Sequence, residues 1–245
     1  MEYIGHSGPL NFIGTGSAFN YNLGNNSAFI KRGSTMLLID CGGSVFHTLG
    51  KLKLFHDINR LYVAITHLHP DHVGSLGDLI FYTYYAYQFK TTLIYPDPPS
   101  LINLLASMGV TEEFYDFLTI SNTKEVKISD INIKYLIQDH SSTLKSFAYI
   151  LELAGTKIYY SGDAKSIPDI ILQQLSTNEI DYFYQDTCSY EGDQIPHLSL
   201  NKLADYIPAN LRHKVYCMHI DESFDITKAQ SLGFKIAVNY HKVDL

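Results

Sequence analysis

The sequence predicts a mixed α/β protein in which two blocks of strands are each followed by helices. Short apolar, β-branched runs recur along the chain, and several of them end in a histidine or an aspartate. The chain has 245 residues, of which 46% are hydrophobic and 18% are charged. It is therefore long and apolar enough to bury a substantial core, and we expect one domain spanning residues 1–245.

The first half of the chain predicts strands that alternate with helices. The segment Leu10–Gly16 runs as a strand into GTGSAF, where two glycines permit a tight turn whose backbone amides can line a cavity. Short apolar runs that follow predict strands, and the longer segments between them, in which apolar residues recur at helical spacing, predict helices. The predicted strands are Ser27–Lys31 paired with Met36–Asp40, then Leu61–Ile65 and Leu93–Tyr95; the predicted helices are Val45–Leu54, Leu76–Phe89, Ser100–Met108 and Thr111–Phe117.

The helix Leu76–Phe89 is unusual because tyrosines and phenylalanines are distributed around all of its sides. A helix that is apolar all round is expected to be buried all round. We favour burial of these aromatic side chains in a two-fold interface between copies of the chain. The alternatives are that they form part of the core or that they are a platform on which a base stacks.

The second half predicts a further sheet. The predicted strands are Val126–Ile128, Ile131–Ile137, a hairpin of Phe147–Leu153 with Lys157–Tyr160, then Ile180–Gln185, Lys214–Met218 and Phe234–Tyr240. Two helices are expected, at Ile167–Leu175 and after Ser199, whose hydroxyl suits a helix cap.

The motif THLHPDHVG directly follows the strand Leu61–Ile65 and supplies four potential metal ligands within six positions. In extended backbone, side chains two residues apart point the same way, so His67, His69 and Asp71 can converge, while His72 opens a helix. Imidazole nitrogens combined with a carboxylate are what zinc and similar cations bind, and mixed sites of this kind commonly hold two ions. Further candidates lie in the second half: His140, Asp163, Asp186 and His219 follow predicted strands, and His197 precedes the helix that Ser199 can cap.

This pattern resembles the H-x-H-x-D-H signature of metallo-β-lactamase-fold hydrolases, over nearly the full length of the chain. The resemblance implies a four-layer αββα sandwich with two divalent metal ions, most often Zn²⁺, with Mn²⁺ as an alternative. It also implies that Asp40, in the sequence Asp-Cys-Gly, orients a histidine. The implied ligands are His67, His69 and His140 on one ion, Asp71, His72 and His219 on the other, and Asp163 between them.

The pair of Asp186 and His197 resembles the acidic residue and histidine of the ribonuclease Z branch of that fold. The resemblance implies that His197 assists the leaving oxygen or contacts the phosphate and that Asp186 orients it, with Asp71 as the third catalytic residue. The chain departs from the family pattern because Glu-Ala-Thr is replaced by Asp186-Thr187-Cys188. The resemblance to that branch is thus closer at His197 than at Asp186.

The charge and cysteine content limit the possible partners. The net charge is −7 and the chain has no basic run, whereas proteins that bind long nucleic acids usually present a basic surface. Three widely spaced cysteines indicate neither a disulfide framework nor a thiolate zinc site. With no signal peptide and no apolar stretch of membrane-spanning length, we expect a cytoplasmic protein, in the host cytoplasm if a phage encodes it.

These observations favour a phosphodiesterase that acts on a small nucleotide. GTGSAFN together with THLHPDHVGSLG looks most like the anti-Pycsar cyclic-nucleotide phosphodiesterases, which implies hydrolysis of 3′,5′-cyclic mononucleotides and evasion of immunity. The alternative is a ribonuclease Z-type endonuclease that trims transfer RNA. Thioester or lactone hydrolysis fits less well because glyoxalase II carries a helical C-terminal domain, and a di-iron redox site would usually have glutamate where His69 stands.

Overall fold

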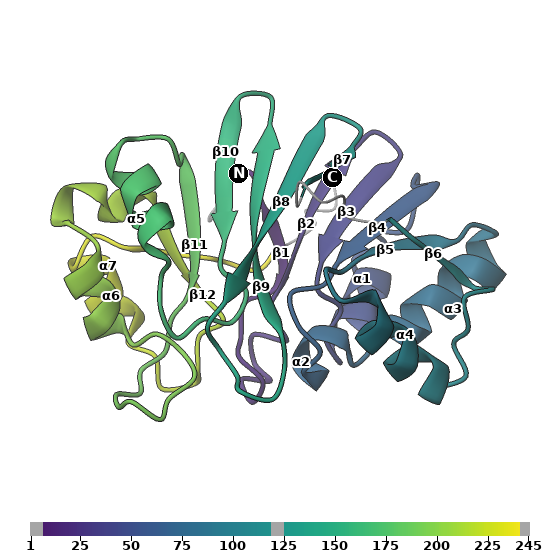
Figure 1. Ribbon diagram of the computed structural model, residues 1–245, viewed down its shortest axis with the longest axis horizontal. Helices are drawn as coiled ribbons and strands as arrows, with labels where there is room; N and C mark the ends of the chain where they lie inside the picture. Colours follow the sequence, from purple (N-terminus) through teal and green to yellow (C-terminus); the bar gives the residue numbers. More distant parts are fainter. Residues whose placement is uncertain (1–6, 119–124, 241–245) are drawn as a thin grey trace. The chain divides into compact units, whose positions relative to one another are not determined.

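The computed structural model describes residues 7–118 and 125–240, which fall into two compact units (Figure 1). The amino-terminal unit lies within Pro9–Ile120 and Asn239–Leu245, and the carboxy-terminal unit lies within Met1–Gly8 and Ser121–Val238. Each unit contains one β-sheet. The mixed α/β class predicted from the sequence is therefore observed, while the single domain stays a prediction.

The sheet of the amino-terminal unit has six strands that follow the order of the chain. The first three strands pair in antiparallel fashion, and the remaining strands add in parallel. The strands are β1 (Asn11–Gly14), β2 (Ser27–Arg32), β3 (Thr35–Ile39), β4 (Arg60–Ala64), β5 (Thr91–Ile94) and β6 (Tyr115–Phe117).

This strand order brings three loops to one edge of the sheet. Because β1 and β3 are both antiparallel to β2, and β4 is parallel to β3, the carboxyl ends of β1, β3 and β4 share an edge. The loop after β1 and the short helix α2 lie at this edge in Figure 1. The helices of the unit are α1 (Val45–Lys51), α2 (Pro70–Val73), α3 (Leu76–Tyr87) and α4 (Pro98–Ser107).

Two sequence predictions differ from the structure. The segment Thr111–Phe117 is not a helix: a turn closes between Phe114 and Thr111, and β6 then pairs with β5. The alternating Tyr-Asp-Phe of β6 gains a parallel partner, which outweighs its helical pattern. The closing strand is also shorter than predicted, because only Lys235–Ile236 (β13) pairs with its neighbour.

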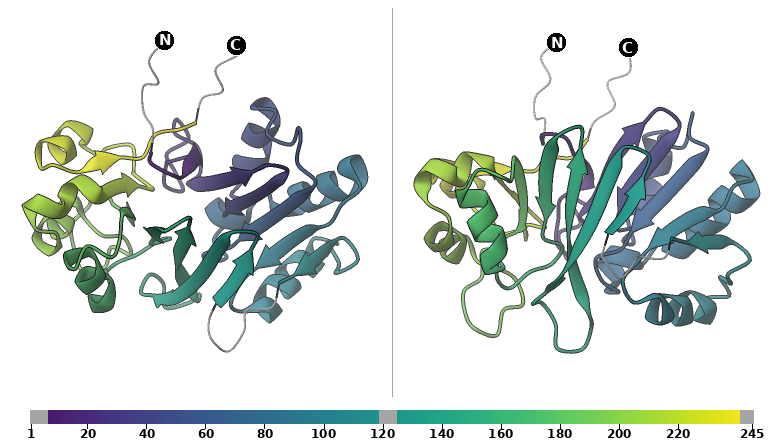
Figure 2. Two further views of the ribbon diagram at one scale, coloured as in Figure 1. Left: turned by 90° about the horizontal axis from the view of Figure 1, so that it is seen from above. Right: turned by 45° about the horizontal axis from the view of Figure 1, so that its top comes forward.

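The carboxy-terminal unit contains a seven-stranded sheet in the order β13-β12-β11-β10-β9-β8-β7. Its helices lie together beside β11 and β12 (Figure 2). The strands are β7 (Glu125–Ile128), β8 (Ile131–Gln138), β9 (Ser146–Leu153), β10 (Thr156–Tyr160), β11 (Tyr182–Asp186), β12 (Val215–Met218) and β13; the helices are α5 (Asp169–Ser176), α6 (Leu200–Tyr206), the 3₁₀ helix η1 (Ala209–Lys214) and α7 (Ile226–Ser231). The predicted cap of α6 is present, since Ser199 Oγ accepts from the amide of Lys202 at 3.2 Å.

The topology of this sheet also gathers strand ends. The strand β9 is antiparallel to both β8 and β10, and β10, β11 and β12 run parallel to one another. The carboxyl ends of β8, β10, β11 and β12 therefore lie at the same edge. These are the strand ends that carry the predicted site residues of the second half: His140, Asp163, Asp186 and His219.

Within the chain, helix α3 is buried on one face and not all round. Leu76, Leu79, Ile80 and Thr83 are buried, whereas Tyr85 is 66% exposed. The expectation of a helix buried on every side therefore does not hold within one copy of the chain. Among the described residues, no helix is both long and apolar enough to cross a membrane.

Candidate functional site

A buried carboxylate organises the predicted ligands of the amino-terminal unit. Asp40 follows β3 in the left-handed backbone conformation, with φ 64°, and is fully buried. Its Oδ1 accepts from the Thr66 amide at 2.7 Å, and its Oδ2 accepts from the Thr66 hydroxyl at 2.7 Å and lies 2.8 Å from Nδ1 of His72. As predicted, Asp40 orients a histidine, and it also joins the ends of β3 and β4 to helix α2.

The four side chains of the THLHPDHVG motif form two pairs of ligand atoms. Nε2 of His67 lies 2.9 Å from Nδ1 of His69, and Nε2 of His72 lies 3.3 Å from Oδ2 of Asp71. His67 and His72 are completely buried. His67 thus lies beside His69, and His72 lies beside Asp71. Because Asp40 holds Nδ1 of His72, the opposite nitrogen of that ring is the one turned toward Asp71.

Glycine brings the backbone after β3 against the motif. A Cβ added at Gly42 would lie 1.9 Å from the carbonyl oxygen of Asp71 and 2.8 Å from Cβ of Asn25. The Cys41 amide also donates to the His72 carbonyl at 2.7 Å. The Asp40-Cys41-Gly42 segment thus packs against the backbone of Asp71 and His72. Only glycine at position 42 allows the two backbone segments to come this close.

Burial raises the pKa of Asp40 above its ordinary value, although the neighbouring His72 and the hydrogen bonds from Thr66 act in the opposite direction. A buried carboxylate costs free energy unless it is paired and hydrogen-bonded. The three donors around Asp40 provide that compensation, so removing any one of them is expected to disturb the others.

In the carboxy-terminal unit, Asp163 presents one oxygen to each of two histidines. Oδ2 lies 3.7 Å from Nε2 of His140, and Oδ1 lies 3.4 Å from Nε2 of His219. Gly162, with φ 59°, and His219, with φ 55°, both adopt the left-handed conformation that turns these side chains toward each other. The two histidines thus lie on opposite oxygens of one carboxylate.

Asp186 contacts two histidines, His197 and His219, through their Nδ1 atoms. Its Oδ2 lies 2.6 Å from Nδ1 of His197 and accepts from the Ala164 amide at 2.8 Å, and its Oδ1 lies 3.2 Å from Nδ1 of His219. Burial alone would raise the pKa of Asp186, but the two histidines outweigh burial and lower it. For His197, burial lowers the pKa, and the stronger combined effect of Asp186 raises it. Asp186 therefore contacts Nδ1 of both rings, and its contact with His197 is the shorter of the two.

Three supporting groups were not found by sequence reasoning. The Thr66 hydroxyl supports Asp40, Ser161 Oγ accepts from the Asp186 amide at 2.9 Å, and the Pro196 carbonyl lies 2.9 Å from Nδ1 of His140. Thr66 lies two residues after β4 and Ser161 directly follows β10, and their hydrogen bonds form only when the neighbouring strands are paired. Pro196 acts through its backbone, so its residue type carries no signal.

The donor sets of both units suit a divalent cation. Each offers imidazole nitrogens and carboxylate oxygens on buried or half-buried side chains, and in each a second carboxylate holds the far nitrogen of a histidine. In the carboxy-terminal unit, ligand atoms of Asp163, Asp186, His197 and His219 all lie within 4.8 Å of one another. The three cysteines are unpaired and buried, and burial raises the pKa of each thiol to about 12, so thiolate ligands are not expected.

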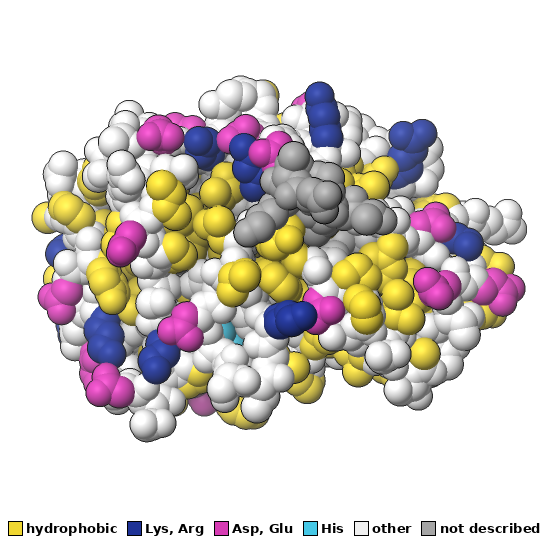
Figure 3. Space-filling model, viewed as in Figure 1, with side chains coloured by type: hydrophobic (Ala, Val, Ile, Leu, Met, Phe, Trp, Pro, Cys, Tyr) yellow, Lys and Arg dark blue, Asp and Glu magenta, His cyan; other side chains and the backbone are white. Residues whose placement is uncertain are grey.

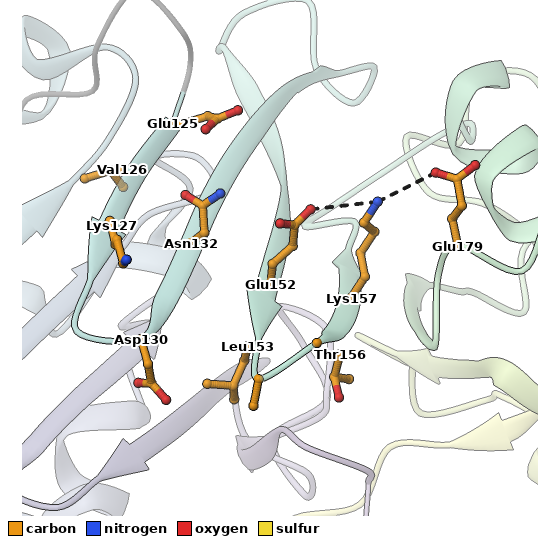
Figure 4. A pocket seen from close by; sticks show the side chains of 12 residues that line it. Glu125, Val126, Lys127, Asp130, Asn132, Glu152, Leu153, Thr156, Lys157 and Glu179 are labelled. Carbon is orange, nitrogen blue, oxygen red and sulfur yellow. Dashed lines mark ion pairs between the residues drawn. The ribbon is translucent and has the colours of Figure 1, made fainter.

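A hollow of about 770 Å³ in the carboxy-terminal unit lies away from these residues (Figure 4). It is lined by the beginnings of β8 and β10, whereas the predicted ligands follow the ends of these strands. Lys157 lies there between Glu152, at 3.8 Å, and Glu179, at 3.7 Å. Three of its charged groups thus pair with one another, and none of the predicted site residues lines it.

Comparison with known proteins places the chain. The family model described as Anti-Pycsar protein Apyc1 matches residues 9–243. The chain belongs to this family. An anti-Pycsar protein Apyc1 from Paenibacillus harenae is 29% identical over 229 residues, covering 88% of this chain and 91% of the relative. Another from Bacillus phage vB_BveM-Goe7 is 29% identical over 241 residues, with 88% and 90% covered.

Solved structures agree on the fold. The metallo-β-lactamase fold protein YhfI from Bacillus subtilis superposes with a TM-score of 0.74 at 16% identity, covering 95% of each chain. The short form of human tRNase Z gives a TM-score of 0.64 at 18% identity, covering 87% of this chain and 93% of that one. The predicted metallo-β-lactamase fold is confirmed.

We predict that Gly42→Ala destabilises the protein and lowers its metal content, because the added methyl group would overlap the Asp71 carbonyl. Gly50→Ala is the matched control, since nothing lies within 4 Å of its added Cβ and alanine favours the helix α1. Chemical denaturation and metal analysis of both variants measure the effect. Equal stability and equal metal content of the two variants would contradict the tight packing of Gly42 against Asp71.

Proposed function

We propose that this chain, a metal-dependent hydrolase, converts 3′,5′-cyclic mononucleotides to linear nucleotides and so counteracts an immune response that signals through them. Membership of the anti-Pycsar family supports the proposal. The single observation that carries it is the contact of 2.6 Å between Asp186 and Nδ1 of His197, beside Asp163. This pair is the feature that the sequence shares with the phosphodiesterase branch of the fold.

We propose two divalent ions, Zn²⁺ or Mn²⁺, as the cofactors. The assignment rests on the order of the ligands along the sequence and on the pairs of ligand atoms within each unit. One ion is assigned to His67, His69 and His140, and the other to Asp71, His72 and His219, with Asp163 shared. When bound, such ions activate water at neutral pH and offset the negative charge that develops on a phosphate.

His197 is proposed to act on the leaving oxygen. Its Nδ1 is held by Asp186, so Nε2 is the ring nitrogen left to face the substrate. In hydrolysis, water adds to phosphorus, the bond between phosphorus and the ribose 3′ oxygen breaks, and that oxygen needs a proton. His197, half-buried and oriented by a buried carboxylate, is suited to donate this proton and to regain one from solvent.

The charge of the chain favours a small substrate over transfer RNA. The net charge is −7, and on the face shown in Figure 3 the lysine and arginine side chains are scattered among aspartates and glutamates. A long RNA requires a continuous basic surface for its phosphates, whereas a mononucleotide presents a single phosphate to the metal site. We propose that the enzyme works in the cytoplasm, where cyclic nucleotides and reduced thiols are found.

The substrate prediction is tested with a panel. The metal-loaded protein should hydrolyse 3′,5′-cyclic mononucleotides carrying different bases and should leave precursor transfer RNA essentially uncut. Chromatography of the products measures both activities. Efficient trimming of the RNA without turnover of any cyclic nucleotide would replace this proposal with the ribonuclease.

Two substitutions distinguish the proposed general acid, His197, from the proposed metal ligand, Asp163. His197→Ala is expected to retain both ions and to lose turnover about a hundredfold or more, because a general acid is removed while the ligand set stays intact. Asp163→Ala is expected to lose metal and activity together, because one carboxylate serves both ions. Metal analysis and kinetics of the two variants decide the roles; loss of metal from His197→Ala would make His197 a ligand.

We also propose a homodimer formed through helix α3. Tyr85 is 66% exposed and Tyr82 is 37% exposed, and a ring contact at 5.1 Å packs Tyr84 against Phe114 beside them. Aromatic surfaces of this kind are typical of interfaces between subunits.

Sedimentation of the wild type should therefore show a dimer at micromolar concentration. Tyr85→Glu should shift it toward the monomer, because a charge would be buried in the interface. Ile170→Glu, at a side chain 50% exposed on helix α5, is the matched control and should remain dimeric. A wild-type monomer at these concentrations would rule out the interface.

A further inference from the structure

The loop between β1 and β2 carries two of the most exposed large side chains among the residues that the structure describes. Phe19 is 90% exposed and Tyr21 is 81% exposed, while Asn20 between them is 5% exposed. Two exposed aromatic side chains therefore flank a buried one in this loop, and we refer to the two rings as the aromatic surface. Rings of this size are usually covered, so their exposure calls for an explanation.

The loop is held closed by its own backbone. The Gly16 amide donates to the Gly24 carbonyl at 2.9 Å, and the Asn26 amide donates to the Gly16 carbonyl at 3.0 Å. At Gly16 an added Cβ would lie 2.7 Å from the Asn20 carbonyl oxygen, so glycine is needed for this closure. Inside the loop, the Asn20 amide donates to the Ser17 carbonyl at 3.1 Å. The two rings thus project from a loop whose shape is set before any ligand binds.

The base of this loop reaches the metal ligands of the same unit. The Asn25 amide donates to Ser44 Oγ at 2.8 Å, and the Ser44 amide donates to Asn25 Oδ1 at 2.9 Å. Gly42 is packed between Cβ of Asn25 and the carbonyl oxygen of Asp71. The loop and the THLHPDHVG motif also follow strand ends at the same edge of the sheet (Figure 1). Asn25, at the base of the loop that carries the two rings, is therefore linked to the ligand motif through Gly42.

We propose that Phe19 and Tyr21 form the surface on which the nucleobase of the substrate stacks while its phosphate binds at the metal ligands. This inference rests on the proposed function and adds the residues that recognise the base. Every nucleobase has a flat π face, so stacking tolerates different bases, and purines, with more ring area, should gain most. A loop that is already closed loses little conformational entropy when the base binds, which strengthens a small contact.

The test compares substrates with and without a base. KM and kcat are measured for the wild type and for Phe19→Ala/Tyr21→Ala with 3′,5′-cyclic AMP, 3′,5′-cyclic CMP and the base-free ribose 3′,5′-cyclic phosphate. The double variant should raise KM for cyclic AMP about tenfold or more, raise it less for cyclic CMP, and leave the base-free substrate unchanged. Metal content and melting temperature should stay at wild-type values, because both rings face solvent.

Two further variants act as controls. Phe19→Tyr/Tyr21→Phe keeps both rings and should retain the wild-type KM, and Tyr206→Ala, at a side chain 43% exposed on helix α6, should also be unaffected. If the double alanine variant keeps its KM for cyclic AMP while the wild type is active, the stacking proposal is overturned and the proposed function stands. If its KM rises equally for the base-free substrate, the loop acts on the phosphate and the stacking proposal is likewise overturned. If the wild type hydrolyses none of the three compounds, both proposals fail.

Discussion

The predicted ligands of the amino-terminal unit depend on the contacts that the buried Asp40 carboxylate makes with Thr66 and His72. It accepts two hydrogen bonds from Thr66 and contacts His72, so one side chain ties the end of β3 to the end of β4 and to helix α2. Without these donors, a fully buried carboxylate would be strongly unfavourable. Asp40 and its partners therefore form a unit in which strand pairing, helix position and ring orientation are set together.

In the carboxy-terminal unit, Asp186 has the place that Asp40 has in the amino-terminal unit. This carboxylate is also fully buried and also contacts histidines through Nδ1, and so leaves their Nε2 atoms for other partners. In both units the aspartate sits at a strand end beside the ligands and is not itself among those predicted. The ring orientation of three histidines, His72, His197 and His219, thus depends on two carboxylates that the proposed chemistry never consumes.

Much of the site was predictable because the signal is local. His67, His69, Asp71 and His72 stand within six residues, and each later candidate closely follows an apolar run or precedes a capped helix. Most strands were predicted to within about two residues, as expected for short runs bounded by turns. The predicted helix Thr111–Phe117 is wrong because β6 pairs with β5, a partner distant in the sequence. Thr66 and Ser161 were missed for the same reason, since their hydrogen bonds need two strands to be aligned first.

The strands at the sheet margins have a consequence for solubility. An unpaired strand edge can recruit the same edge of another molecule, and long flat edges are the usual origin of β-aggregation. Here β13 has two residues and β6 has three, β1 is broken by an irregular register at Phe12 to Gly14, and β7 carries Glu125 and Lys127. Each of these edge strands is thus too short, too irregular or too charged to pair readily with a strand of another molecule. These margins thus work against pairing of one copy of the chain with another, edge to edge, in a sequence rich in tyrosine and β-branched residues.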